Sequence, residues 1–156
     1  MILRPTLVPV KPPLLSAPSV GGGTHLIAEW YECDTTRATM LNAGVLRMLC
    51  LRLAQAAGLQ IVGDAFHQFL PHGVTGTVLL AESHLAIHTW PETGFVTLDV
   101  YVCNYLTDNS QKAFGLYAAL EAHFQPVRTQ YSQLLRGAQA ITSKAGAFQA
   151  IAADHG

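Results

Sequence analysis

The sequence carries little charge: only 12% of its 156 residues are Asp, Glu, Lys or Arg, and its formal net charge is −1. A chain without a basic surface lacks the electrostatic attraction that binds nucleic acid or an acidic membrane. It also lacks an uninterrupted apolar run of the length that a signal peptide or a membrane-spanning helix needs. These absences predict a cytoplasmic protein that has neither nucleic acid nor a membrane as its partner.

Cysteine is scarce as well. Cys33, Cys50 and Cys103 are odd in number and do not make a disulfide framework. A reduced, cytoplasmic setting therefore fits these thiols better than an oxidising one.

Half of the residues are hydrophobic, and the length suits one domain with a substantial core. Residues 1–23 contain five prolines and end in three glycines, so we expect a flexible leader there. Residues 24–136 form the predicted folded domain. The Ala- and Gln-rich residues 137–156 have weak periodicity, and we expect a mobile tail or a peripheral helix.

The apolar pattern within the domain is typical of an α+β fold. Apolar, β-branched runs predict strands, and the Gly- and Pro-containing breaks between them predict turns. The order of the elements predicts a two-layer sandwich, with an antiparallel sheet that two main helices cover on one face. The predicted strands are residues 25–31, 60–62, 65–70, 74–81, 84–90, 95–102 and 127–135, and the predicted helices are residues 38–57 and 111–124.

Each predicted helix has an apolar stripe that we expect to face the sheet. Asp34, Thr35 or Thr36 is expected to cap the first helix, and Gly58 to end it. The stripe of the first helix is Leu41, Val45, Leu46, Met48, Leu49, Leu53 and Ala56, and that of the second is Phe114, Tyr117, Ala118, Leu120 and Phe124.

Polar chemistry is concentrated at a junction between two predicted strands, Glu82-Ser83-His84. A serine hydroxyl is a poor nucleophile unless a base takes its proton, and His84 and His88 are the nearby bases. The G-x-S-x-G motif of many hydrolases is absent. From spacing alone, Ser83 is better explained as a surface turn serine beside two strand histidines.

The same histidines raise the alternative of a metal site. A spacing of four residues suits two ligands on a helix, but on a strand it separates His84 and His88 by about 13 Å. A third ligand would have to come from His67, His72 or Cys33, which are distant in sequence. The pattern therefore predicts no metal.

Four segments together resemble a known family. They are T-H-L-I-A-E-W-Y-E-C-D (residues 24–34), F-H-Q-F-L-P-H-G-V-T-G (66–76), E-S-H-L-A-I-H-T-W-P-E (82–92) and L-D-V-Y-V-C-N (98–104). The chain is similar over roughly two thirds of its length to the bacterial S-adenosylmethionine decarboxylase proenzymes, which cleave themselves and depend on a pyruvoyl group.

This resemblance implies a protein that makes its own cofactor. The hydroxyl of Ser83 attacks the carbonyl of Glu82, the amide becomes an ester, and β-elimination separates residues 1–82 from residues 83–156. Ser83 is thereby converted to a pyruvoyl group, whose ketone forms a Schiff base with the substrate amine and accepts electrons as CO₂ leaves. The product is the aminopropyl donor for spermidine synthesis, and members of the family are dimers.

Roles follow from the resemblance, residue by residue. Ser83 matches the pyruvoyl precursor, His88 the histidine needed for processing, and Cys103 the acid that protonates the product. Thr75 stands where many members have a serine that supports processing. Because threonine keeps the hydroxyl, we expect cleavage to be slower or unaltered but not lost.

Three further residues match the substrate site of the family. Phe69 and Trp90 match aromatic positions that line it, and Glu92 matches a carboxylate that accepts hydrogen bonds from ribose hydroxyls. Without the resemblance, Phe69 and Trp90 would be read as core or interface residues, and Cys103 as a small buried hydrophobe.

The spacing of Ser83 and His88 sets a geometric constraint. On one extended strand they lie about 16 Å apart and point to opposite faces. Either the chain bends sharply at Ser83, or the cooperating histidine comes from a second subunit.

Two other functions fit the sequence. The same fold and cofactor can decarboxylate L-ornithine or L-arginine, and Glu92 suits a basic amino acid as well as a nucleoside. A non-catalytic paralogue that regulates a true decarboxylase belongs to a different class, but the presence of Ser83, His88 and Cys103 together disfavours it.

Overall fold

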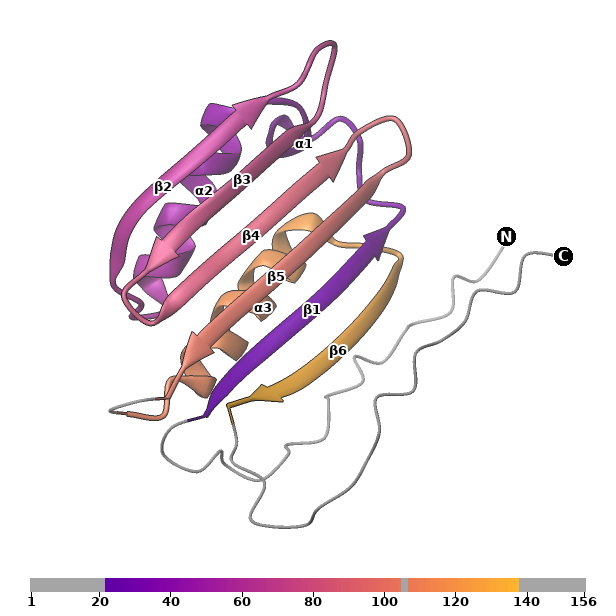
Figure 1. Cartoon of the computed structure of the whole chain (residues 1–156). Coiled ribbons are helices and arrows are strands. Elements are labelled where there is room, and N and C mark those ends of the chain that lie inside the picture. The colour runs from indigo at the N-terminus through magenta and orange to yellow at the C-terminus, as the bar shows by residue number, and fades with distance from the viewer. Residues whose placement is uncertain (1–21, 105–106, 138–156) are drawn as a thin grey trace, which may run out of the picture.

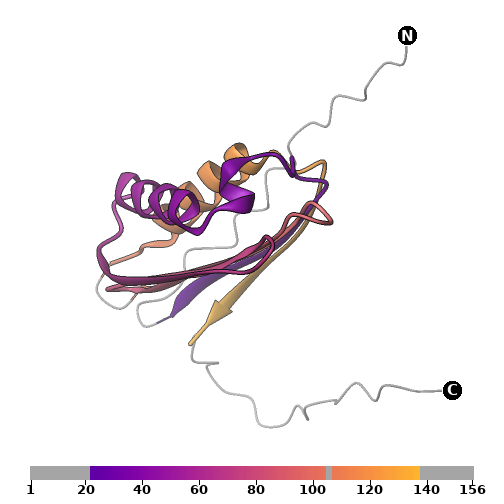
Figure 2. The same cartoon turned by 90° about the horizontal axis from the view of Figure 1, so that it is seen from above.

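The computed structural model describes residues 22–104 and 107–137. They form one six-stranded antiparallel sheet in the order β2-β3-β4-β5-β1-β6, with helices on one face only (Figures 1 and 2). The predicted α+β two-layer sandwich is confirmed. The strands are β1 (Gly23–Tyr31), β2 (Ile61–Gln68), β3 (Val74–Leu80), β4 (Ser83–Trp90), β5 (Phe95–Cys103) and β6 (Arg128–Arg136), and the helices are α1 (Ala38–Leu41), α2 (Ala43–Ala56) and α3 (Ser110–Phe124).

Side chains alternate along each strand between a face buried under the helices and an uncovered face. On β5, Val96, Leu98, Val100 and Val102 are fully buried under the helices, while the residues between them are only partly covered. The same period of two runs through β1, β3 and β4. Among the described residues, no helix or strand covers the second face, which we call the open face.

The core lies between the sheet and the two longer helices. Its largest fully buried side chains include Trp30 from β1, Met40 from α1 and Phe124 from α3. Trp30 packs against Tyr117 and Phe124, with ring centroids 5.8 and 5.7 Å apart. Among the described helices, none has the length and apolarity to cross a membrane.

The first predicted helix is wrong in two respects. None of the expected cap residues Asp34, Thr35 and Thr36 caps it, because the N-cap residue of α1 is Arg37, which makes no side-chain cap bond. The predicted helix is also divided into two. The chain is extended at Asn42, whose side chain accepts a hydrogen bond from the Val45 amide and so caps α2. Asn42 was not expected to be a cap, because its neighbours on both sides favour helix. Gly58 does follow the end of α2, with φ of +77°.

The helix stripes are also partly different from the predicted ones. In α2 the buried residues are Leu46, Leu49, Cys50 and Ala54, while Val45, Met48 and Ala56 face solvent. In α3, Ala118 is exposed and Phe114 is only partly buried, while Ala113 and Leu116 are buried together with the expected Tyr117, Leu120 and Phe124.

The strand ends are near those predicted, with one exception. Residues 61–68 are one strand rather than two, because the irregularity at Gly63 is absorbed as a shift of register against β3 between Ile61 and Gly63. The predicted leader and tail lie outside the described residues apart from Gly22, Gly23 and Gly137. β1 begins at Gly23, two residues before the predicted start.

The side chain of Gln68 joins the helix layer to the sheet. Its Oε1 accepts from the Ala43 amide at 2.8 Å, and its Nε2 donates to the carbonyls of Leu41 and Gly73 at 3.0 Å each. These groups lie at the break between α1 and α2 and at the turn between β2 and β3, where regular backbone pairing is unavailable. One amide therefore satisfies backbone groups of two separate segments.

We predict that Gln68→Ala lowers the free energy of unfolding by about 1–3 kcal/mol, because it leaves partly buried backbone groups without partners. Urea unfolding followed by circular dichroism measures the change. Gln55→Ala, on the exposed side of α2, is the matched control and should alter the free energy by less than about 0.5 kcal/mol. Equal effects of the two substitutions would show that the Gln68 bonds contribute nothing net.

Candidate active site

The Glu82–Ser83 peptide bond lies at the start of β4, after a two-residue hairpin loop. Leu80 pairs with Ser83, so Ala81 and Glu82 form the turn. In the favoured two-residue hairpins, a residue within the turn has a positive φ. In this hairpin, whose residues are all described, the positive φ is instead at Ser83, the first residue of β4, with a value of 150°. A side chain in that region of backbone space costs of order 1–3 kcal/mol. The hairpin therefore stores its strain at the serine.

The carbonyl of Glu82 is held by the neighbouring strand. The Cys103 amide donates to it at 2.8 Å. Cys103 is itself anchored, because the Asn104 amide donates to the Gly22 carbonyl at 2.7 Å and the Asn104 side chain contacts Ser110 at the start of α3. This network fixes an N–H group on the carbonyl oxygen that would become negatively charged if Ser83 attacked it.

The thiol of Cys103 differs from the other two. It lies partly exposed on the open face, 3.6 Å from the hydroxyl of Tyr101. This contact and burial raise the pKa of Tyr101. Burial also raises the pKa of Cys33 to about 11 and that of Cys50 to about 12, so neither is a ready proton donor or nucleophile.

The side chains of four residues on β1, β4 and β5 form a compact cluster on the open face next to Ser83: His25, His84, Asp99 and Tyr101. We call them the His84 cluster. The Nδ1 atom of His84 lies 3.2 Å from the Ser83 Oγ. The His25 Nε2 lies 3.0 Å from Asp99 Oδ1, and the ring of His25 meets the edge of His84 with centroids 6.4 Å apart. Burial, followed by the charge of His25, lowers the pKa of His84.

A second polar group lies toward the other end of β4. The hydroxyl of Thr75 on β3 is 2.6 Å from the Nδ1 of His88, directly opposite it in register. The two residues help to line a cavity of about 340 Å³. A second hollow of about 400 Å³ adjoins it and shares Thr75 and His88.

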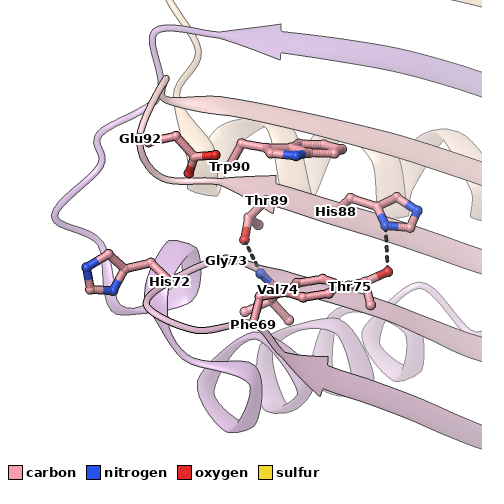
Figure 3. Close-up of a pocket in the computed structure, with 9 residues that line it drawn as sticks. All are labelled: Phe69, His72, Gly73, Val74, Thr75, His88, Thr89, Trp90 and Glu92. Atoms are coloured by element: carbon pink, nitrogen blue, oxygen red, sulfur yellow. Dashed lines mark hydrogen bonds between the residues drawn. The ribbon is translucent and has the colours of Figure 1, made fainter.

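The predicted substrate residues border this cavity. Phe69 and Trp90 are 48% and 39% exposed, and Glu92 lies in the exposed turn after β4. Figure 3 shows Phe69, Thr75, His88 and Trp90 gathered together, with His72 pointing away from them. The complete lining is Phe69, His72, Gly73, Val74, Thr75, His88, Thr89, Trp90 and Glu92.

The structure thus brings the predicted site residues together in two groups rather than one. Ser83 and Cys103 lie at one end of the sheet, and Thr75, His88, Phe69, Trp90 and Glu92 lie at the other. β4 runs unbroken from Ser83 to Trp90. The five residue steps from Ser83 to His88 along this strand therefore span about 16 Å. No bend between them closes this distance.

Sequence reasoning missed His25, Asp99 and Tyr101. His25 and Asp99 are 74 positions apart and meet only because β1 and β5 pair. Both lie inside the segments that carried the family resemblance, which was the one available signal. Within the described residues, no three His, Cys, Asp or Glu side chains are grouped as metal ligands.

The fold and the two groups define a class: an α+β domain whose sheet carries a strained serine junction at one end and a pocket of aromatic and polar residues at the other. Residues 24–137 match the family model of S-adenosylmethionine decarboxylase. The chain is 43% identical over 115 residues to the S-adenosylmethionine decarboxylase proenzyme of Archaeoglobus fulgidus, covering 74% of this chain and 97% of that protein. It is 42% identical over 100 residues to the proenzyme of Thermotoga maritima, covering 64% and 75%.

A solved structure agrees with these matches. The crystal structure of the adenosylmethionine decarboxylase from Aquifex aeolicus superposes with a TM-score of 0.68 at 32% identity, covering 81% of this chain and all of that one. The chain belongs to the S-adenosylmethionine decarboxylase family. The predicted family and the predicted class of enzyme, a decarboxylase, are confirmed.

We predict that Cys103 is the cysteine most readily alkylated in the native protein, because it alone among the three thiols is partly exposed. Brief treatment with iodoacetamide and peptide mass spectrometry should place the first adduct on Cys103. Cys103→Ala, treated in parallel, should take up reagent only on the timescale of unfolding. Labelling of Cys33 or Cys50 at the rate of Cys103 would contradict this assignment.

Proposed function

We propose that this protein is a self-processing, pyruvoyl-dependent decarboxylase of S-adenosyl-L-methionine that supplies the aminopropyl donor for spermidine synthesis. The observation that carries the proposal is the strained Ser83, preceded by a carbonyl that the Cys103 amide holds. This arrangement suits attack of the Ser83 hydroxyl on the Glu82 carbonyl, since strain and a positioned N–H both favour the reaction.

The residues around Ser83 fit the pyruvoyl group that cleavage would leave there. Cleavage at Glu82–Ser83 relieves the strained backbone, and the partly exposed thiol of Cys103 lies next along the sheet. Within the described residues, the buried Oε2 of Glu82 has no hydrogen-bond partner, which leaves an acceptor for an incoming donor. A pyruvoyl group supplies an electrophilic carbonyl that withdraws the electrons released as CO₂ departs.

The chain's own side chains perform the remaining tasks in this proposal. Cys103 donates a proton to the former α-carbon of the product. Phe69 and Trp90 offer exposed aromatic faces for the adenine, and Glu92 offers a carboxylate for the ribose hydroxyls. His88, oriented by the Thr75 hydroxyl, serves in processing.

We also propose that the working unit is a homodimer with shared sites. The two groups of site residues are too far apart to act together within one protomer, and the open face exposes large apolar side chains that include Leu79, Leu134 and Phe69. A second copy packed on this face would cover that surface. It would also bring its own His88 group to the Ser83 of the first copy.

The two alternatives receive no support from the relatives. The names of the matched proteins are those of S-adenosylmethionine decarboxylases, not of ornithine or arginine decarboxylases. Retention of Ser83, His88 and Cys103 also disfavours a non-catalytic paralogue.

We predict that the purified protein consists of two chains, residues 1–82 and 83–156, the second beginning with a pyruvoyl group in place of Ser83. Intact mass spectrometry under denaturing conditions measures both. The same sample should release CO₂ from S-adenosylmethionine but not from L-ornithine or L-arginine.

Two variants serve as controls for this experiment. Ser83→Ala should remain one chain, and Cys103→Ala should cleave but turn over substrate at least about 100-fold more slowly, as expected for loss of a general acid. A wild-type chain that stays whole on prolonged incubation would overturn the proposed function and favour the regulatory paralogue. Cleavage with turnover of ornithine alone would overturn the substrate.

We predict that Ser83→Ala and His88→Ala chains complement each other. Each variant alone should stay uncleaved, but a mixed dimer contains one site with an intact Ser83 and an intact partner His88. After subunit exchange, which tagged chains verify, cleavage of the His88→Ala chain at Glu82–Ser83 should appear by mass spectrometry. Absence of cleavage in verified mixed dimers would exclude shared sites.

A further inference from the structure

Two histidines on β4 are available for the two steps of self-cleavage, and the structure places them differently. His84 Nδ1 lies within hydrogen-bonding distance of the Ser83 Oγ, at 3.2 Å in the same chain. His88 directs its Nδ1 to the Thr75 hydroxyl instead, and it lies about 16 Å along the strand from Ser83. Only His84 is therefore placed to act on the hydroxyl proton of Ser83 within one protomer.

The surroundings of His84 suit a neutral base. A neutral imidazole accepts a proton at Nδ1 when its Nε2 carries the hydrogen. The charged or titratable groups that face the ring are His25 from β1, Asp99 and Tyr101 from β5, and Arg136 from β6. Burial is the largest cause that lowers the pKa of His84, and the charge of Arg136 lowers it further, so the ring is unprotonated at neutral pH despite the opposing charge of Asp99.

The cluster also fixes the position of the ring. Tyr101 lies opposite His84 in the register of β4 and β5, with ring centroids 5.9 Å apart. The hydrogen bond between His25 and Asp99 holds the His25 ring in place. This ring reaches His84 from β1, which lies beyond β5, and packs edge-on to it. The imidazole therefore has restricted freedom to turn away from Ser83.

We propose that His84 is the general base of the first cleavage step, the conversion of the Glu82–Ser83 amide to an ester. This inference rests on the proposed self-cleavage and assigns a residue to it. His84 Nδ1 takes the hydroxyl proton as the Ser83 oxygen bonds to the Glu82 carbonyl carbon. The carbonyl oxygen takes up negative charge against the Cys103 amide. The carbon–nitrogen bond then breaks, and the proton passes from His84 to the Ser83 nitrogen, leaving an ester and a free amine.

The second step needs a base elsewhere, because its proton leaves the Ser83 α-carbon. As that proton departs, the bond from Cβ to Oγ breaks and the Glu82 acyl group leaves as a carboxylate. Water then replaces the nitrogen, which is released as ammonia. In the proposed dimer, the His88 of the second copy takes this proton, so His84 and His88 act in separate steps. The intermediate between those steps is a chemically distinct ester.

Hydroxylamine distinguishes the two steps because it cleaves esters but leaves peptide amides intact. Wild type, His84→Ala, His88→Ala and the control His123→Gln, which alters a histidine in the helix layer, are synthesised by cell-free translation and sampled over time. Intact mass with and without hydroxylamine is the readout. We expect His84→Ala to cleave at least about 100-fold more slowly than wild type and to resist hydroxylamine.

The other chains define the comparison. His88→Ala should accumulate the ester and be split by hydroxylamine between residues 82 and 83, and His123→Gln should cleave like wild type. Added imidazole should restore cleavage to His84→Ala, which a purely structural role would not allow. Where circular dichroism shows that His84→Ala is unfolded, His84→Gln replaces it, with slow cleavage and resistance to hydroxylamine expected.

Several results would overturn the assignment. They are cleavage of the folded His84 variant at the wild-type rate, accumulation of a hydroxylamine-sensitive ester in it, or failure of imidazole to restore cleavage to folded His84→Ala. A wild-type chain that never cleaves would instead overturn the proposed function itself. The two failures are therefore distinguishable.

Discussion

The register between β3, β4 and β5 is the constraint on which the rest of the site depends. Backbone hydrogen bonds place Leu80 opposite Ser83, and Ser83 opposite Val102, so the turn between β3 and β4 can hold only Ala81 and Glu82. Because side chains alternate with a period of two, a slip of one residue would turn the buried Leu85 and Ile87 to the open face. The hydrophobic core thus fixes the position of the Glu82–Ser83 bond.

The same register explains why the strain at Ser83 persists. A positive φ at a serine costs of order 1–3 kcal/mol, and an isolated hairpin would relax it. Here the strands on both sides are buried under α2 and α3, and the Cys103 amide holds the Glu82 carbonyl at 2.8 Å. The stability of the core offsets the strain, and the strained bond is the one that the proposed reaction breaks.

The sequence predicted the features that depend on local pattern and missed those that depend on pairing. The apolar, β-branched run in 95–102 predicted β5 to within one residue, and Pro71-His72-Gly73 and Pro91 to Gly94 gave correct turns. The break at Asn42 was invisible, because it is stabilised by Gln68, which lies 27 positions from Leu41. The bond of His25 to Asp99 also joins distant segments, so no spacing rule indicated it. The roles of Ser83, His88 and Cys103 came from family resemblance and remain predictions.

The distance between Ser83 and His88 has a consequence for how such a protein is organised. A continuous strand keeps them about 16 Å apart, and its rigidity, which the strained hairpin requires, also prevents the two groups from meeting within one chain. The proposed dimer supplies this second group of residues to Ser83 from another copy of the chain. The open face carries that group, which includes the exposed aromatic residues Phe69 and Trp90. Association through this face would bury apolar surface and complete the site in one event, so that self-cleavage would depend on assembly.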